Sequence, residues 1–381
     1  MNKSIYFSEE HYLLQDQVRR FIEEKVLPHG DQWEKDGMVP RNILKEMGDL
    51  GFFGIQYDAK YGGADMSVLG SVLFAEELGK SSYGGFAITA LVHTDMASPH
   101  LYNAGNSDQL SEYMPDIIAG NKITAVAVTE PDAGSDVAGM KTRAVQDGDH
   151  WVLNGSKMFI TNGVNADLYF VAAKTDSSAK GSRGVTIFII EKGTEGFSVG
   201  RSLDKMGWRS SDTAELVFDN VRIHKDQILG EVNKGFYAIM KNFQNERTVL
   251  GAQAIGESEK ALEITLDYVK SRSAFGATLW DKQAIRQRLS KLQMEVAAGK
   301  QLLYHAAWLD ASGAECVKEV SMVKAYCGEL VNRVMYDCQQ FHGGFGYMKE
   351  ATIERMVRDA RVQSIGGGAT EVMLEEIAKR S

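Results

Sequence analysis

Residues 234–254 read KGFYAIMKNFQNERTVLGAQA, and their hydrophobic pattern decides how the second half of the chain folds. Apolar side chains recur every three or four residues, which is the period of an amphipathic helix. The pattern continues to residue 271, so it predicts one long helix over 234–271. Similar patterns follow over 283–311, 315–341, 350–359 and 370–380. Long helices with short connections are typical of an antiparallel bundle.

One acidic residue, Glu246, lies on the apolar stripe of this long helix. The stripe is formed by Phe236, Ile239, Met240, Phe243, Leu250 and Ala254. A carboxylate on such a face loses hydration, which raises its pKa toward the range of a general base. The same position also suits a residue at the edge of the stripe that forms a salt bridge. The residues alone favour neither interpretation.

Between about residues 121 and 228 the pattern changes to short β-branched and aromatic runs separated by turns. The runs cover 123–129, 151–153, 157–161, 168–173, 185–190 and 214–218. Asn154-Gly155 stands between two of them and predicts a two-residue hairpin turn, which we prefer to a glycosylation site at Asn154. The spacing predicts a small antiparallel barrel or sandwich and not a parallel Rossmann sheet.

The first 120 residues have the pattern of helices. Ser8 precedes an amphipathic run that Pro28 ends, and further helical patterns cover 41–50, 67–80, 86–104 and 108–119. The predicted fold class is therefore α+β with three domains. These are an N-terminal all-α domain (1–120), a middle antiparallel β-barrel domain (121–228) and a C-terminal four-helix bundle (229–381).

Composition excludes several classes of protein. Hydrophobic residues at 44% and charged residues at 24% of the 381 are typical of a globular protein, not a fibre or a disordered chain. The formal net charge of −9 argues against binding to nucleic acid or anionic membranes. We expect no membrane span and no secretory signal, because no apolar run is long enough for either.

The three cysteines predict no disulfide framework and no metal site. Cys316, Cys327 and Cys338 are eleven residues apart, which places them on one face of a helix. We expect buried structural thiols in a reducing compartment. Nucleotide, metalloprotease and esterase signatures (GxGxxG after a strand, the P-loop, HExxH, GxSxG) are also missing from the sequence.

Three further kinds of segment suit a ligand but also have a structural explanation. The loop 129–136 (TEPDAGSD) is dense in acceptors and backbone donors, although a capped loop explains it as well. The strand 157–163 alternates an aromatic and a hydroxyl side chain, as a strand under a flat ring would. The glycine-rich turns 342–347 and 366–371 allow a backbone to approach a ligand closely, and they also reverse the chain between helices.

Taken in order, these segments resemble the acyl-CoA dehydrogenase family of flavoproteins. The matching segments are 127–131, 133–136, 157–163, 206–207, 211–213, 272–276, Gln283, 342–347 and 358–360. Each motif is short, but their common order is highly specific and covers essentially the whole chain. The helix–barrel–helix layout of the family also matches the layout that the periodicity predicts.

The resemblance implies an FAD-dependent oxidation of a fatty acyl-CoA thioester to the trans-2-enoyl thioester. A carboxylate takes the α-proton, and the β-hydrogen leaves as hydride to N5 of FAD. The residues implied to flank the isoalloxazine ring, with both threonines as donors, are Val126, Val128, Thr129, Phe159 and Thr161. Those implied to contact the cofactor from the last glycine turn are Gly367, Gly368, Ala369 and Glu371.

The resemblance also implies a site shared between subunits. The positions that should reach the FAD of a neighbouring subunit are Arg272, Phe275, Gln283, Gln340 and Gly344. The positions that should lie along the acyl-CoA channel are Ser135, Ser182, Phe236, Phe243 and Arg247. No metal is implied.

One position departs from most of the family. Most members place the catalytic glutamate at the position of Gly367, which has no side chain here. Long-chain and isovaleryl-type members place it on the long helix instead, and Glu246 aligns with that position. The resemblance therefore implies that Glu246 is the base, and that Gly367 contributes a backbone N–H which polarises the thioester carbonyl.

The implied partners are the acyl-CoA substrate and an electron-transferring flavoprotein, within fatty acid β-oxidation. The family implies a homotetramer (a dimer of dimers) in the bacterial cytoplasm or the mitochondrial matrix. An oxidase is disfavoured, since peroxisomal oxidases carry an additional C-terminal domain. The alternative is a non-catalytic or repurposed homologue, either flavin monooxygenase-like or an assembly factor. Straight-chain, branched and terpenoid thioesters all stay open as substrates.

Overall fold

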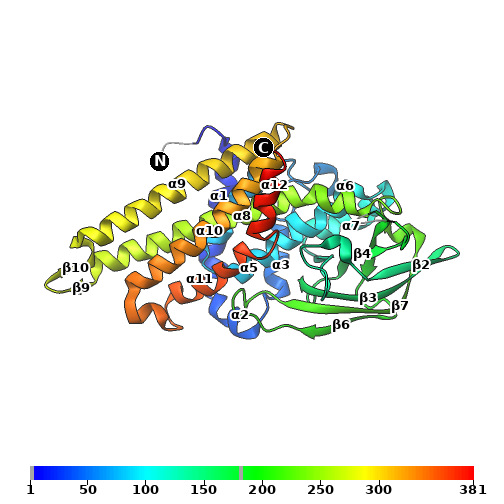
Figure 1. Cartoon of the computed structure of the whole chain (residues 1–381), viewed down its shortest axis with the longest axis horizontal. Helices are drawn as coiled ribbons and strands as arrows, with labels where there is room; N and C mark the ends of the chain where they lie inside the picture. Colours follow the sequence, from blue (N-terminus) through cyan, green and yellow to red (C-terminus); the bar gives the residue numbers. More distant parts are fainter. Residues whose placement is uncertain (1–3, 180–182) are drawn as a thin grey trace.

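A computed structural model describes residues 4–179 and 183–381 of the chain. Within these ranges the chain forms a helical N-terminal block, a β-sheet and a second helical block, in that order. This confirms the predicted layout. Figure 1 shows an elongated molecule with the sheet at one end and, at the other, the short hairpin of β9 (Ser273–Ala274) and β10 (Ala277–Thr278).

The N-terminal block contains the predicted helices and one more. Its α-helices are α1 (Glu9–Phe21), α2 (Gly30–Asp36), α3 (Arg41–Asp49), α4 (Val68–Lys80), α5 (Gly84–Leu91), α6 (Ser98–Ala104) and α7 (Ser107–Ile118). The additional helix α2 buries only Gly30 and Trp33, so it has no apolar period for sequence analysis to detect. A 3₁₀ turn, η2 (Ala59–Tyr61), lies between α3 and α4.

Two of the predicted continuous helices contain a π-helical segment. The run predicted over 86–104 is α5, then η3 (Val92–Ala97), then α6. In the same way η1 (Ile22–Val26) extends α1 almost to Pro28. Such segments widen a helix and are frequent at functional sites. Two backbone carbonyls of η3, those of Asp95 and Met96, accept hydrogen bonds from the long C-terminal helix.

The described part of the middle block forms one eight-stranded sheet. Its strands are β1 (Thr124–Ala127), β2 (Arg143–Asp147), β3 (His150–Thr161), β4 (Leu168–Lys174), β5 (Val185–Glu191), β6 (Phe197–Ser202), β7 (Thr213–His224) and β8 (Ile228–Leu229). The strand order is β6-β7-β3-β2-β4-β5-β8, with β1 also paired to β4. Most pairs are antiparallel, as predicted.

Two pairs in this sheet are parallel, which the sequence did not predict. β1 pairs with the first half of β4, and β2 pairs with the last residue of β4. β1 and β2 therefore lie along the same edge of β4 and run in the same direction as β4. The segment 128–142 between them must leave the sheet at this edge, which places the loop 129–136 outside the β core.

The predicted hairpin turn at Asn154-Gly155 is wrong. Both residues lie inside β3, which pairs with β7 on either side of them. The register shifts between Leu153 and Gly155, and Gly155 has a φ of +146°. The register shift marks a β-bulge at this point of β3. Glycine is required there because a side chain would collide with Thr142. The turn lies earlier, at Gly148 between β2 and β3.

The C-terminal block confirms the predicted helices. They are α8 (Gly235–Ser271), α9 (Gln283–Ala311), α10 (Val317–His342), α11 (Thr352–Ala360) and α12 (Thr370–Ala378). The 3₁₀ turns η7 (Gly343–Tyr347) and η8 (Arg361–Ser364) follow α10 and α11. The three cysteines are free and buried, Cys316 directly before α10 and the other two within it, as predicted.

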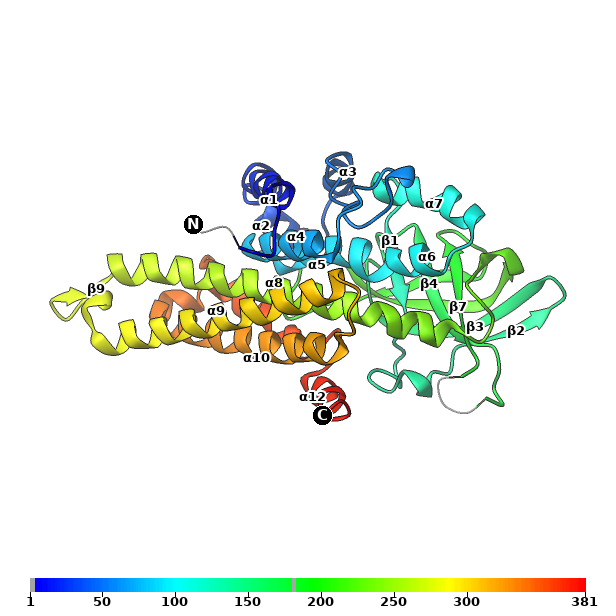
Figure 2. The same ribbon diagram turned by 90° about the horizontal axis from the view of Figure 1, so that it is seen from above.

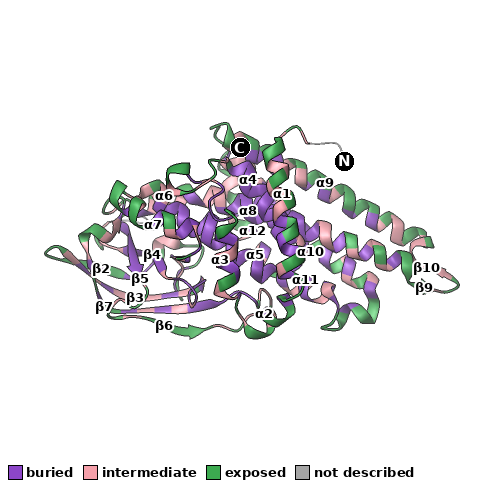
Figure 3. Cartoon of the chain, turned by 180° about the vertical axis from the view of Figure 1, so that it is seen from behind, coloured by how far each residue is buried: buried purple, intermediate pink, exposed green. Residues whose placement is uncertain are grey.

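The long helix α8 joins the blocks into one molecule. Its second half packs with α4, α9 and α10, while Ile239 in its first half belongs to the hydrophobic cluster beneath β4 and β5. Figure 2 shows α8 passing from the bundle under α5 and α6 to the sheet. Figure 3 shows that α4, α5 and the middle of α8 are largely buried. The first half of α8 is therefore where all three blocks meet.

Candidate active site

Glu246 lies in the first half of α8, at this meeting point, and its side chain is buried with 8% exposed. Burial raises the pKa of Glu246 to about 8, although a hydrogen bond from Asn242 and the charge of Arg247 oppose the rise. Among the residues that the structure describes, Glu246 forms no ion pair. The salt-bridge interpretation of this residue therefore fails, and an ionisable carboxyl group remains buried without an ion-pair partner in the described chain.

Arg247 and Phe243 lie on the neighbouring face of α8. The guanidinium carbon of Arg247 is 5.5 Å from the centroid of the Phe243 ring, a cation–π distance. Burial lowers the pKa of Arg247, and the charge of Glu246 partly offsets this. The Arg247 Nε lies 3.7 Å from the point where Gly368 would carry a Cβ. This face of α8 therefore contacts the last glycine turn.

The turn Gly366–Gly368 lies against α8 one helical turn beyond Glu246. Gly367 and Gly368 have φ of +62° and +100°, which glycine adopts without strain. A Cβ at Gly367 would lie 2.2 Å from Leu250 Cδ1. Leu250 therefore fills the space that a side chain at position 367 would need. The structure brings Gly367 next to the helix that carries Glu246.

Lys324 on α10 holds this turn, and the sequence analysis did not single it out. Its ammonium donates to the carbonyl oxygens of Gln363 (2.6 Å) and Gly368 (3.1 Å), one on each side of the turn. Burial lowers the pKa of Lys324 to about 8. The signal that was available is its position, since Lys324 interrupts an apolar run between Val323 and Ala325.

Val126 in β1 and Val128 just after it share a hydrophobic cluster with the first half of α8. Both are half-buried and pack against the hydrophobic cluster that also receives Phe236 and Phe243 of α8. The end of β1 is tied to β3, because the Thr129 carbonyl accepts a hydrogen bond from the backbone N–H of Met158 at 2.9 Å. The structure thus brings the predicted strand and helix residues together.

Phe159 is an exposed aromatic residue in a strained conformation within β3. Its φ is +61° and 65% of the residue is exposed, at a register shift between Lys157 and Ile160. A bulky residue in the left-handed region is uncommon and tends to mark a functional site. Thr161 is half-buried and ends the same strand. The bulge thus presents an exposed aromatic ring two residues before a hydroxyl.

The loop 129–136 contains one residue with a structural role, Glu130, and one exposed residue predicted to contact the substrate, Ser135. Glu130 is buried and pairs with Lys157 Nζ at 2.8 Å. Burial raises the pKa of Glu130, but Lys157 and the backbone donors outweigh it and the pKa is lowered. Ser135 is exposed and free to contact a ligand. Ser182, the other predicted channel serine, lies outside the described residues.

A second group of predicted residues lies at or near the β9–β10 hairpin and the end of α10, and Figure 1 shows this hairpin at the end of the molecule opposite the sheet. These exposed residues are Arg272, Phe275, Gln283, Gln340 and Gly344. Phe275 is 96% exposed with a φ of +54° at the tip of the β9–β10 hairpin. The rings of Tyr268 and His342 stack with centroids 4.3 Å apart, which connects α8 to the turn that holds Gly344. One chain cannot bring both groups to one site.

The residues predicted to contact the isoalloxazine ring fit a flat cofactor with a polar edge. Phe159 offers an exposed ring, and the carbonyls and amides at the end of β1 offer polar contacts. Next to the last glycine turn, the buried hydroxyl of Thr370 has no partner among the described residues. Within those residues no group of three His, Cys, Asp or Glu is arranged to hold a metal ion. No helix described here is long and apolar enough to cross a membrane.

Comparison with known proteins identifies the family. The models for the N-terminal, middle and C-terminal domains of acyl-CoA dehydrogenase match residues 8–121, 125–221 and 233–381. The mitochondrial long-chain specific acyl-CoA dehydrogenase of Mus musculus is 40% identical over 375 residues, covering 98% of this chain and 87% of that protein.

A subunit of a flavoprotein complex and a solved structure are similar too. The caffeyl-CoA reductase-Etf complex subunit CarC of Acetobacterium woodii is 37% identical and covers 97% of both chains. The crystal structure of acyl-CoA dehydrogenase from Geobacillus kaustophilus superposes with a TM-score of 0.95, at 39% identity and 99% coverage of both chains. The cofactor of this family is FAD. The chain belongs to the acyl-CoA dehydrogenase family of flavin-dependent oxidoreductases.

Proposed function

We propose that this protein oxidises an acyl-CoA thioester between its α and β carbons, with Glu246 as the base that accepts the α-proton. The observation that carries the proposal is a buried carboxyl group without an ion pair in the described chain, on the helix whose residues Arg247 and Leu250 meet the glycine turn 366–368. Its pKa, raised to about 8 by burial, gives a carboxylate that binds a proton firmly once it has accepted one.

The glycine turn supplies the polarising group in this proposal. An α-proton becomes acidic only when negative charge on the thioester oxygen is stabilised, and a fixed backbone N–H does this well. We assign this N–H to Gly367. Lys324 supports the assignment, because it grips the carbonyls of Gln363 and Gly368 and so limits how the turn between them can move.

FAD would be held by residues from both sides of the site. Val126, Val128 and Phe159 would contact the ring, and Thr129 and Thr161 would donate hydrogen bonds to it. From the glycine turn, the contacts would come from Gly368, Ala369 and Glu371. When bound, FAD supplies the acceptor for the hydride from the β carbon.

The acyl-CoA channel would follow the first turns of α8. Phe236 and Phe243 line it with apolar surface, Arg247 adds a buried positive charge, and Ser135 contacts the thioester carrier from the loop. Long-chain fatty acyl thioesters within β-oxidation are the substrates suggested by the Mus musculus relative. The Ser182 assignment stays a prediction.

Assembly and electron transfer complete the proposal. The exposed residues at the far end of the bundle, including Arg272, Phe275 and Gln283, would complete the FAD site of a neighbouring subunit in a homotetramer. The electron-transferring flavoprotein is proposed as acceptor, which the Acetobacterium woodii relative supports by its name as part of an Etf complex.

The test is anaerobic titration of the FAD-loaded protein with butyryl-, palmitoyl- and isovaleryl-CoA. We expect loss of the yellow flavin absorbance with at least one thioester, together with the 2-enoyl product in a mass spectrum. The panel also ranks chain length and branching. FAD-loaded protein that bleaches with dithionite but with no thioester would contradict the proposal and favour a repurposed homologue.

A further inference from the structure

Asn242 lies one helical turn before Glu246 on α8, and it is buried with 4% exposed. Its amide nitrogen Nδ2 donates to the backbone carbonyl of Met96 at 2.8 Å. The same nitrogen donates to Glu246 Oε1 at 3.3 Å. The same nitrogen also lies 3.5 Å from the backbone carbonyl of Asp95. A side-chain amide has two N–H groups, and the two shorter contacts are those to Met96 and Glu246.

The Met96 carbonyl fixes the amide in this orientation. Met96 belongs to the π-helical segment η3, which packs against α8 and is itself buried. Rotation of the Asn242 amide would leave both N–H groups and the buried Met96 carbonyl without these contacts, which is costly away from water. The amide on α8, anchored to the η3 backbone, is therefore a fixed donor to the Glu246 carboxyl group.

We propose that Asn242 is a positioning residue that favours the ionised form of the Glu246 carboxyl group and orients it to accept a proton. The inference rests on the proposed function in one respect, that Glu246 is the base. Hydrogen bonds to the charged form of a carboxyl group favour that form. Within the described residues, the Glu246 side chain accepts its hydrogen bond from Asn242.

Other charged groups near Glu246 do not take this role. Arg247 points from α8 toward Phe243 and Gly368, and it acts on Glu246 through its charge. From η3, Asp95 is buried and its carboxyl group is held by Gln56 at 3.0 Å. From α10, Lys324 donates to backbone carbonyls of the glycine turn.

The neighbouring residue Asn245 provides a matched control. Its Nδ2 donates to the backbone carbonyl of Asp95 at 2.8 Å, so it ties α8 to η3 by the same kind of bond. The recorded contacts of Asn245 are with Asp95 and Gln56, and Glu246 is not among them. Asn245→Leu therefore removes an equivalent tether without touching the base.

The experiment is an infrared titration of the Glu246 carboxyl band in the FAD-loaded protein, with Glu246→Gln as the blank. For Asn242→Leu we expect the midpoint to rise by about one pH unit, the size of one lost bond to a charged group. At pH 7 the rate of bleaching by acyl-CoA should fall about tenfold with KM little changed. For Asn245→Leu the midpoint should stay at the wild-type value.

Equal midpoints for wild type and Asn242→Leu would overturn the proposal, as would equal shifts for Asn242→Leu and Asn245→Leu. If Asn242→Leu does not fold, Asn242→Asp keeps the shape of the side chain. The new carboxyl group beside Glu246 should raise the titration midpoint of Glu246 above the wild-type value, and no rise would overturn the proposal. A shifted infrared midpoint in a protein that no thioester bleaches would support the positioning by Asn242 and contradict only the proposed function.

Discussion

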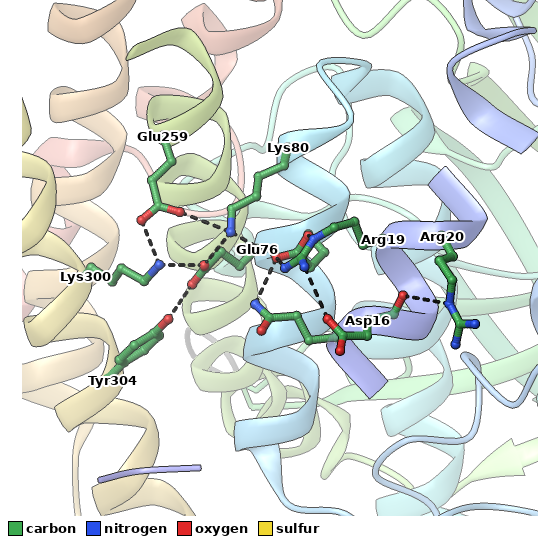
Figure 4. A network of polar contacts seen from close by, with 10 residues as sticks. Asp16, Arg19, Arg20, Glu76, Lys80, Glu259, Lys300 and Tyr304 are labelled. Carbon is green, nitrogen blue, oxygen red and sulfur yellow. Dashed lines mark hydrogen bonds and ion pairs between the residues drawn. The ribbon is translucent and has the colours of Figure 1, made fainter. Parts of the chain in front are cut away.

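Glu246 and Glu76 are both buried carboxyl groups near α8, yet the protein treats them in opposite ways. Glu76 on α4 is fully buried and lies against Gly256 of α8. Its carboxylate contacts Lys80 Nζ at 3.0 Å, Lys300 Nζ at 2.7 Å and Tyr304 Oη at 2.7 Å (Figure 4). Glu246 has an amide donor and no ion pair within the described chain.

The pKa values follow from these neighbours. Burial raises the pKa of Glu76, but Lys80 and Lys300 outweigh it and the pKa is lowered. For Glu246 burial prevails and raises the pKa to about 8. The comparison teaches that burial alone does not make a carboxyl group reactive. Two cations make Glu76 a cross-link between helices, and the lack of an ion pair in the described chain leaves Glu246 able to take a proton.

The largest expected effect separates the reactive carboxyl group from an inert one. We expect Glu246→Gln to lower the bleaching rate with acyl-CoA by about 10²–10⁴-fold, the usual contribution of a general base, while FAD stays bound. The matched control is Glu257→Gln. Glu257 is also buried on α8, with its pKa raised to about 8 by burial, so loss of a buried ionisable group is matched.

The readout is stopped-flow absorbance of the flavin, with FAD content measured from the spectrum. Glu257→Gln should keep most of the wild-type rate. If Glu246→Gln retained more than about a hundredth of the rate, or if both variants slowed equally, Glu246 would not be the base.

The second effect tests Glu76 as a cross-link. Glu76→Gln leaves Lys80 and Lys300 with Glu259 as their remaining shared carboxylate. Because the buried charged contacts of Glu76 are lost, we expect a loss of about 2 kcal/mol in the free energy of unfolding. Urea denaturation followed by circular dichroism measures it. Replacing the exposed Lys60, which pairs with Asp58, by Met should leave the midpoint unchanged, because exposed pairs contribute little. A similar loss in both variants would contradict the cross-link.

The third effect concerns a variant in which the reactive carboxyl group is moved from α8 to the glycine turn 366–368. A glutamate at position 367 in the Glu246→Gly protein would restore a base, but its Cβ would meet Leu250 Cδ1 at 2.2 Å. We therefore expect Glu246→Gly/Gly367→Glu to bleach slowly, and the added change Leu250→Ala to raise its rate about tenfold, or about 1.4 kcal/mol.

Leu250→Ala in the wild-type background is the control for this experiment, and it should not accelerate bleaching. Equal rates for the double and triple variants would show that Leu250 is not the obstacle. In that case the positive φ of Gly367 would be the barrier to a side chain at this position.

The smallest effect is a difference in the pH dependence of stability. Glu246 has a pKa of about 8 in the folded protein, against an unperturbed pKa of 4.5. Raising the pH between these two values therefore destabilises the fold, because only the unfolded chain has already lost the proton. Glu246→Gln should therefore gain stability relative to wild type as the pH rises from 5 to 8, by about 1 kcal/mol or more. Thermal unfolding at several pH values measures it.

The Glu76 variant should have the opposite slope. The pKa of Glu76 is lowered in the fold, so its stabilisation is present above the unfolded value and is lost as the pH falls through the folded value. The cost of Glu76→Gln should thus be largest near neutral pH and smaller in acid. Parallel pH profiles for the two variants would contradict the comparison.

The period of apolar residues predicted the long elements and failed at short ones. Period alone located α8 to α11, because each buries several residues along one face, and it also located α12, which buries Thr370 and Met373. The period missed α2. The turn motif Asn154-Gly155 misplaced the hairpin, because the same two residue types also occur at a β-bulge, which is what they form here. The strained Phe159 was predicted from the resemblance, but its backbone conformation came only from the structure.

For the candidate site, the apolar stripe of the sequence singled out Glu246 because a polar residue on such a stripe is conspicuous. Lys324 and Asn242 were not singled out. Their partners, Gly368 and Met96, are far away in sequence. The sequence of a helix does not reveal which backbone carbonyl of another segment one of its side chains will contact.

The sequence by itself determined the order of the three blocks, the length of α8 and the face on which Glu246 lies, because these depend on the local period of apolar residues. Only the tertiary structure decided that Glu246 has an amide and, within the described chain, no paired cation beside it, while Glu76 has two lysines. The ionisation of a buried group is set by what other segments bring within a few ångströms, and that is a property of packing.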